Sequence, residues 1–223
     1  IDNAFIETVG GYLVRFSAEQ QISSFFGYQF DKVDPTTGDV LYKDLNGNGY
    51  FDTGDRTFIG NPTPDYTLGF TNNFKYKNWY LDVLVTASQG NDVYNATRFD
   101  LELMNDFKNQ STVVLDRWTT AGQITNIPKA NTSTAMYISD RFVEDGSFVK
   151  LKNVTLGYNF NNPFKGVSKL NVYLTGQNLY TWTDYTGFDP EVNAFNTTNG
   201  VFGIDYGTYP QVRTVILGLK ANF

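Results

Sequence analysis

The sequence predicts an all-β fold, an antiparallel sheet of the kind that closes into a transmembrane barrel. Several segments alternate between apolar and polar residues with a period of two, which is typical of strands with two unlike faces. Short and long connections alternate between these segments. Aromatic residues make up 17 % of the chain and charged residues only 18 %, with a mean hydropathy of -0.34. A barrel reconciles these figures, because its strands show apolar residues only to lipid and its aromatic residues gather at the two membrane interfaces.

Five segments carry the alternation. In Tyr66–Tyr76 the even positions are mostly apolar or aromatic, and in residues 79–87 the odd positions are apolar. The other three segments are residues 154–160, 170–182 and 215–223. A weaker, earlier pair of strands is expected at residues 12–16 and 22–30.

Alternation alone fits a soluble β-sandwich equally well, and the connections separate the two folds. Residues 77–78 and 161–166 are short connections, whereas 33–65, 90–146 and 183–210 are long. Transmembrane barrels have short periplasmic turns and long external loops, and compact sandwiches rarely carry loops beyond about 15 residues. If the last strand ends on the periplasmic side, counting back places both short turns there and every long connection outside. The connections therefore favour the barrel.

Composition and charge exclude several function classes. The net charge of -6 and the isoelectric point of about 4.6 argue against nucleic-acid binding, because phosphate contacts need a basic surface. The chain has no Cys and no His, which removes disulfide frameworks, thiol catalysis, the usual general base and the commonest metal ligand. We expect Asp189 and Glu191 to be solvated loop carboxylates rather than a glycosidase pair. The sequence does not predict an enzyme.

The chain has no run of about 20 apolar residues, the length that a membrane helix needs. Its start at Ile1 has neither the basic nor the apolar region of a signal peptide. We expect either that a signal has been removed or that the sequence begins within something larger.

Residues 44–55 fit the pattern of a calcium-binding EF-hand loop, with Asp instead of Glu at the twelfth position. Oxygen donors at this spacing suit a hard cation such as Ca²⁺, and Gly49 allows the sharp turn. The candidate ligands are Asp44, Asn46, Asn48, Tyr50 through its backbone carbonyl, Asp52 and Asp55. Such a segment also forms an Asx- and Gly-rich turn without metal. The sequence leaves a structural calcium site and a metal-free turn open.

Aromatic residues in or beside the long connections are candidates for a substrate-binding platform. These residues are Trp118, Trp182, Tyr185 and Phe188. The alternative is that they belong to an interface girdle or to loop packing. Residues 99–107 have apolar positions near helical spacing and predict a short external helix. The terminal Phe223 continues the apolar face of the last strand and is a candidate assembly signal.

Seven sequence phrases follow one another in a fixed order after a first match at FFGY (25–28). They are GDVLYKDLNGNGYFDTGDRTFIGNPTPDYTLGF (38–70), SQGNDVYN (88–95), LDRWT (115–119), IPKA (127–130), SDRFVEDGSFVKLKNVTLGYNF (139–160), TGQNLYTWTDYTGFDPEV (175–192) and YPQVRTVILGLKANF (209–223). In these phrases the chain resembles the SusC/RagA family of TonB-dependent outer-membrane transporters, over about 200 residues.

The resemblance implies a 22-stranded, multi-pass barrel in the cell outer membrane, with an N-terminal plug and long extracellular loops. Residues 1–223 would be the C-terminal part of this single barrel, with about six or seven strands, and the plug and the N-terminal strands are expected outside this sequence. The resemblance implies uptake of oligosaccharides or peptides. Its implied partners are TonB, a SusD-like surface lipoprotein, the rest of the barrel and outer-membrane lipid.

A different class of function stays open at this point. A secreted calcium-binding module that binds carbohydrate or mediates adhesion would also be β-rich, acidic and free of Cys. Partition with detergent-extracted membranes separates this alternative from a transporter segment.

Overall fold

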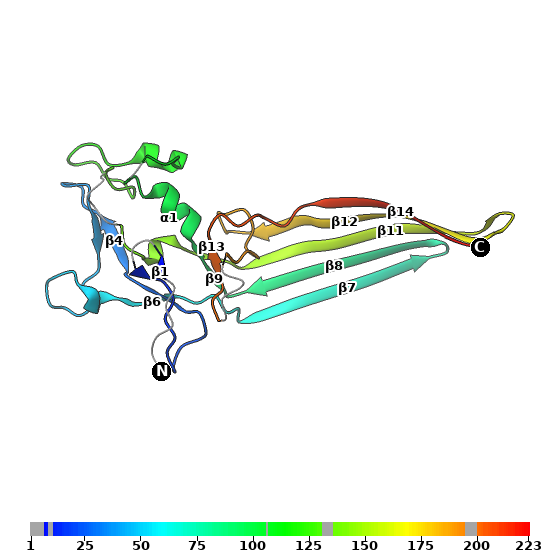
Figure 1. Cartoon of the computed structure of the whole chain (residues 1–223), viewed down its shortest axis with the longest axis horizontal. Helices are drawn as coiled ribbons and strands as arrows, with labels where there is room; N and C mark the ends of the chain where they lie inside the picture. Colours follow the sequence, from blue (N-terminus) through cyan, green and yellow to red (C-terminus); the bar gives the residue numbers. More distant parts are fainter. Residues whose placement is uncertain (1–6, 9–10, 106, 131–135, 195–199) are drawn as a thin grey trace. The chain divides into compact units, whose positions relative to one another are not determined.

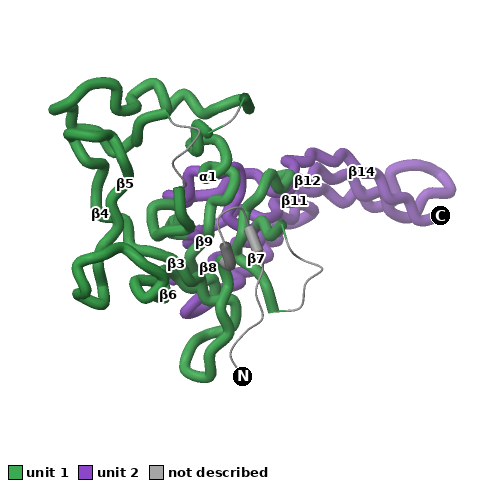
Figure 2. Tube along the Cα trace, turned by 60° about the vertical axis from the view of Figure 1, so that its left-hand side comes forward, with its two compact units in different colours: residues 1–63, 91–145, 192–209 green, residues 64–90, 146–191, 210–223 purple. Residues whose placement is uncertain are grey.

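The computed structural model describes the chain except for residues 1–6, 9–10, 106, 131–135 and 195–199. The chain folds as two compact units, coloured separately in Figure 2 and described here one at a time. Unit 1 consists of residues 1–63, 91–145 and 192–209, and unit 2 of residues 64–90, 146–191 and 210–223.

Unit 2 is a single antiparallel sheet of long strands (Figure 1). Its strands are β7 (Tyr66–Tyr76), β8 (Trp79–Gln89), β11 (Phe148–Phe164), β12 (Val167–Thr183) and β14 (Thr214–Asn222). Their spatial order is β14-β12-β11-β8-β7, so that β7 and β14 are the edges of the sheet within the described residues. All five alternating segments are confirmed as strands, and β11 and β12 are longer than the alternation predicts.

The strand register gives the sheet two unlike faces. Leu81 lies between Phe74 and Leu156, so one face is apolar across three strands. Asp82, one position on, lies between Asn73 and Thr155 on the opposite face. The same separation continues to β14, where apolar residues again meet apolar residues of β12. The predicted alternation of faces is therefore confirmed in register as well as in sequence.

Both predicted short connections are present at one end of the sheet, and one is shorter than expected. Residues 77–78 join β7 to β8 as a two-residue turn. We expected a connection over residues 161–166, but Phe164 pairs with Val167, and that expectation is wrong. The pairing is interrupted at residues 162–163 and then resumes. Asn162 adopts a left-handed φ of 46° there, and Pro163 has no N–H that would be left unpaired.

Two tyrosine rings cover glycines on the polar face. A Cβ built on Gly157 would lie 2.2 Å from Cζ of Tyr80, and one on Gly218 would lie 2.1 Å from Cζ of Tyr173. The Tyr80 hydroxyl also donates to Asn171 Oδ1 at 3.1 Å. The rings thus lie flat over neighbouring strands and fill the space that a side chain would take.

Unit 1 is built from the three long connections and the N-terminal segment. Its strands are β1 (Glu7–Thr8), β2 (Gly11–Tyr12), β3 (Phe25–Gly27), β4 (Phe30–Val33), β5 (Val40–Tyr42), β6 (Thr57–Gly60), β9 (Asp92–Asn95), β10 (Val143–Asp145) and β13 (Ile204–Asp205). Its helices are α1 (Ala96–Glu102) and the 3-10 turns η1 (Thr53–Asp55), η2 (Thr112–Asp116) and η3 (Asp140–Phe142). None of the helices in the described part of the chain has the length and hydropathy of a membrane-spanning helix.

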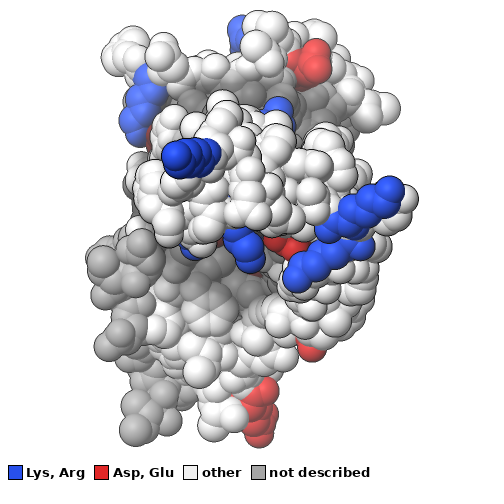
Figure 3. Space-filling model, turned by 90° about the vertical axis from the view of Figure 1, so that its right-hand side faces the viewer, with Lys and Arg blue, Asp and Glu red and all other residues white. Residues whose placement is uncertain are grey.

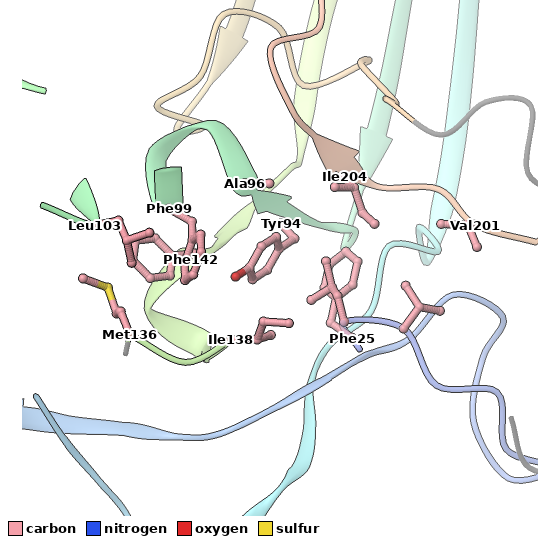
Figure 4. Close-up of a cluster of buried hydrophobic side chains, with 12 residues drawn as sticks. Phe25, Tyr94, Ala96, Phe99, Leu103, Met136, Ile138, Phe142, Val201 and Ile204 are labelled. Atoms are coloured by element: carbon pink, nitrogen blue, oxygen red, sulfur yellow. The ribbon is translucent and has the colours of Figure 1, made fainter. Parts of the chain in front are cut away.

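These connections, expected as loops, fold around a hydrophobic core of their own (Figure 4). Tyr94 packs its ring edge-on against Phe25, with centroids 6.0 Å apart, and lies 6.4 Å from Phe142. All three side chains are buried. Because Phe25 lies in the N-terminal segment and Tyr94 and Phe142 lie at opposite ends of the connection 90–146, their meeting has no local signature in the sequence.

Two weaker predictions in unit 1 need adjustment. Residues 13–15 pair antiparallel with residues 24–26, as the Phe26 N–H donates to the Leu13 carbonyl at 2.7 Å, but this early pair is outside the five-stranded sheet. The helix expected at 99–107 is instead α1, which begins three residues earlier because the Asn95 side chain caps it by accepting the Arg98 N–H.

A methyl group at Gly157 tests the packing of Tyr80. We expect Gly157→Ala to lower the unfolding free energy of the full-length protein by about 1–3 kcal/mol, because Tyr80 must leave its position over β11. Gly69→Ala is the matched control, since its Cβ would point into open space. Denaturant midpoints in detergent micelles measure both variants, and equal midpoints would contradict the close packing.

Candidate functional site

The polar face of the five-stranded sheet is hollowed near the short turns. The hollow has a volume of about 840 Å³ and is lined from both edge strands, by Asn73 and Lys75 of β7 and by Lys220 and Asn222 of β14. In a flat sheet these edges would lie about 19 Å apart, at four strand spacings. One hollow that reaches both edges therefore requires the sheet to curve with its polar face inward.

Basic residues dominate this hollow. Lys75, Lys77, Lys169 and Lys220 line it, together with a single carboxylate, Asp82. Basic side chains, drawn in blue, stand out in the view onto this end of the molecule (Figure 3). No motif in the sequence marks these lysines as site residues, because each occupies an ordinary polar position of a strand or turn.

A buried lysine anchors the connection after β12. Lys150, on the polar face of β11, is only 1 % exposed. Its Nζ donates to Asp189 Oδ1 at 3.0 Å and also contacts Glu191, which pairs in addition with Lys152 at 3.0 Å. A buried ammonium group needs compensating charge, and the two carboxylates supply it.

The Asp189 carboxylate also holds a second segment, the one that contains Gln211. Its Oδ1 accepts the N–H of Glu191 at 3.0 Å, and its Oδ2 accepts the N–H of Gln211 at 3.1 Å. Asp189 and Glu191 were expected to be solvated, and for the buried Asp189 that expectation is wrong. The physical reason is Lys150, which lies 39 residues earlier in the chain and draws the connection onto the sheet.

The acidic segment 44–55 in unit 1 is closed by its own side chains. Asp44 accepts hydrogen bonds from two backbone N–H groups of the loop, one at each carboxylate oxygen. Asp55 accepts the N–H of Leu45 at 2.9 Å and, with its other oxygen, the N–H of Asp52 at 2.9 Å. Bonds from backbone N–H groups, that of Asp52 foremost, hold the pKa of Asp55 below its usual value.

The two asparagines of this loop bear on the metal prediction. Asn46 and Asn48 each donate their Nδ2 group to Asp52, at 3.3 and 2.7 Å, while their Oδ1 atoms accept backbone N–H groups. Within the described residues, no group of three or more His, Cys, Asp or Glu converges as a metal site. The oxygen donors nevertheless fit Ca²⁺ chemically, because each amide oxygen has a second lone pair and Asp52 needs only to turn from the amides.

The acidic loop places Phe51 in an aromatic cluster. Phe51 stacks on Tyr42 with centroids 5.0 Å apart, and lies 4.6 Å from Tyr28 and 5.3 Å from Tyr137. The Tyr42 hydroxyl accepts the Tyr137 N–H at 2.9 Å, and burial raises the pKa of Tyr42 to about 12. The loop is thereby fixed to the body of unit 1 by packing.

The four predicted substrate-binding aromatics are divided between the two units. Trp118 is in unit 1, where its ring covers Gly38 and its Nε1 donates to the Pro35 carbonyl at 3.0 Å. The other three are in unit 2. Trp182 is half-exposed on the apolar face beside Tyr180.

The two remaining aromatics differ in exposure. Tyr185 is buried and its ring covers Gly187, whereas Phe188 is 80 % exposed. Phe223 directly follows β14 and is also exposed, at the end of the sheet that carries the short turns. Their proposed roles in substrate binding and assembly stay predictions.

Curated relatives match all or most of this chain, although no family model matches it. TonB-dependent receptor P3 of Formosa agariphila is 36 % identical over 100 % of this chain. TonB-dependent receptor SusC of Bacteroides thetaiotaomicron is 33 % identical over 82 % of it. The chain spans 25 % of the first relative and 17 % of the second, so it corresponds to about a quarter or less of their length.

Solved structures share the fold. The structure of the RagAB peptide transporter superposes with a TM-score of 0.81 at 23 % identity, covering 99 % of this chain and 24 % of that one. A RagAB peptide importer in its 'closed-closed' state gives a TM-score of 0.78 at 25 % identity, over 95 % of this chain and 24 % of that one. Each match therefore covers nearly all of this chain and about a quarter of the solved one.

Removing the Lys150 ammonium group tests the anchor. Lys150→Met leaves Asp189 buried without its cation, a change that costs about 3–5 kcal/mol. We expect the amides of Glu191 and Gln211 to exchange with deuterium at least about a hundredfold faster in the full-length protein. Lys152→Met is the control, because its partly exposed pair contributes at most about 1 kcal/mol. Unchanged exchange in Lys150→Met would contradict the anchor.

Proposed function

Because the chain belongs to the SusC/RagA family of TonB-dependent receptors, we propose that it forms part of the wall of an outer-membrane barrel that imports oligosaccharides or peptides. In this proposal residues 1–223 are one part of a single barrel protein. TonB supplies the energy through other parts of the polypeptide, a SusD-like lipoprotein lies over the outer opening, and the chain has no catalytic role.

The observation that carries the proposal is the apolar face of the sheet. It is apolar across all five strands, and its side chains are largely open, as Leu156 (45 % exposed) on the central strand β11 and Leu217 (73 %) on the edge strand β14 show. A soluble β module would bury such a face or lose solubility. In a bilayer the same face lies against lipid, while the curved polar face lines the lumen.

The edges of the sheet support the same conclusion. In the described residues β7 and β14 each have one neighbour in this sheet, so each presents unpaired backbone groups. Such groups cost several kcal/mol each in hydrocarbon. The remaining length of the relatives, about three quarters, is where further strands would come from.

Uptake by the full-length protein tests the proposed function. Cells that carry it as their single importer should take up labelled oligosaccharides or peptides when TonB is functional and lose that uptake when TonB is deleted. Equal uptake with and without TonB would overturn the proposal.

An arginine on each face tests which side meets lipid. Val83 pairs with Asn72 and Val154 on the apolar face near the middle of β8. We expect Val83→Arg to cost about 2–4 kcal/mol of folding free energy in lipid vesicles, since that position lies near the bilayer midplane. Thr71→Arg on the polar face of β7 should cost far less. A larger cost for Thr71→Arg would reverse the assignment of the faces.

We also propose that the acidic loop binds Ca²⁺ as a structural ion. Its oxygen donors support this, and the affinity expected for an extracellular module is a Kd of about 10⁻⁴–10⁻³ M. Titration calorimetry of the full-length protein should show binding that Asp44→Asn removes and that Asp31→Asn, an exposed change outside the loop, retains. No heat of binding up to several times that Kd would disprove the site.

A further inference from the structure

The hollow on the polar face combines excess positive charge with a chain that is acidic overall. Four lysines line it against one carboxylate, although the chain has a net charge of -6. That carboxylate, Asp82, already accepts a hydrogen bond from Asn73 Nδ2 at 2.6 Å. The electrostatic potential in the hollow is therefore positive, because its one carboxylate does not balance four lysines.

The lysines of the hollow differ from the anchored lysines of the same chain. Lys150 and Lys152 form ion pairs with carboxylates. Among the described residues, Lys75, Lys169 and Lys220 have neither an ion pair nor a side-chain hydrogen bond, and all three are exposed. Ammonium groups held in one hollow without counter-charges form a site for a negatively charged ligand.

The neutral groups between the lysines narrow the class of ligand. Asn159 and Asn171 lie next to each other, with Nδ2 of Asn171 donating to Oδ1 of Asn159 at 3.1 Å, and the Tyr80 hydroxyl donates to Asn171. Amide and phenol groups both donate and accept hydrogen bonds, as sugar hydroxyls do. The hollow thus offers partners for hydroxyl groups and for anions together.

We propose that this hollow binds anionic oligosaccharides, sugars that carry carboxylate or sulfate groups, on their way through the barrel. The inference rests on the proposed function and specifies the substrate class. Charge-assisted bonds from Lys75, Lys169 and Lys220 hold the acid groups, and the amides between them hold the hydroxyls. Because the lysines are exposed, their attraction is screened by salt.

Binding of two hexasaccharides to the detergent-solubilised full-length protein tests this site, one built of uronic acids and one of neutral glucose. A variant combining Lys75→Gln, Lys169→Gln and Lys220→Gln should bind the uronic hexasaccharide about tenfold more weakly, with the neutral sugar unaffected. The matched control combines Lys32→Gln, Lys43→Gln and Lys165→Gln, which removes the same charge outside the hollow. It should bind as the native protein does. The difference between the variants should shrink in 0.5 M salt, about where the screening length falls to a few ångström.

Several outcomes would overturn the inference. Equal weakening in the two triple variants would show a non-specific effect of net charge. Equal weakening for the neutral hexasaccharide, or no binding of uronic sugar to the native protein, would exclude an anion site. If the triple variant in the hollow formed a less stable barrel but bound the uronic hexasaccharide as the native protein does, the lysines would contact another part of the polypeptide and not the ligand. If the triple lysine variant lost more affinity for an acidic peptide than for the uronic hexasaccharide, the ligand class would be acidic peptides and not anionic sugars. Binding to the solubilised protein needs no TonB, so equal uptake with and without TonB would refute the proposed function but not this site.

Discussion

Every backbone N–H and C=O group of a strand in hydrocarbon needs a partner in a neighbouring strand, and the architecture of unit 2 follows from this requirement. Five strands pair in order over lengths of nine to seventeen residues. Irregularities such as the one at residues 162–163 interrupt the pairing without ending it. Because side chains alternate along each strand, continuous pairing also aligns every apolar residue on one face. The apolar face and the polar face are thus two sides of one hydrogen-bonded ladder.

The polar face shows how a curved sheet is packed on its inner side. Tyr80 and Tyr173 lie over glycines of the adjacent strands, so large rings fit where two ordinary side chains would collide. Lys150 uses the same face differently, because it is buried and holds Asp189 against the sheet. Near the turns the face is left open, and its lysines remain free of carboxylate partners among the described residues. One face thus contains a packed part, an anchored part and an accessible part.

In unit 1 the long connections are folded and not irregular loops. They share a hydrophobic core with the N-terminal segment, in which Tyr94, Phe25 and Phe142 meet. The acidic loop is tied to this unit through Phe51, and its carboxylates are satisfied by backbone N–H groups. A bound cation would therefore add stiffness to a segment that packing already positions.

The sequence by itself determined the strands, their two faces and the end of the sheet where the short turns lie, because a period of two and a tight turn are local properties. It also determined the acidic loop, whose donors are all within twelve residues. Only the tertiary structure decided that Lys150 meets Asp189, and that Lys75 and Lys220 share one hollow. Those contacts depend on strand order and sheet curvature, which arise from pairing between distant segments. No pattern within either segment records them.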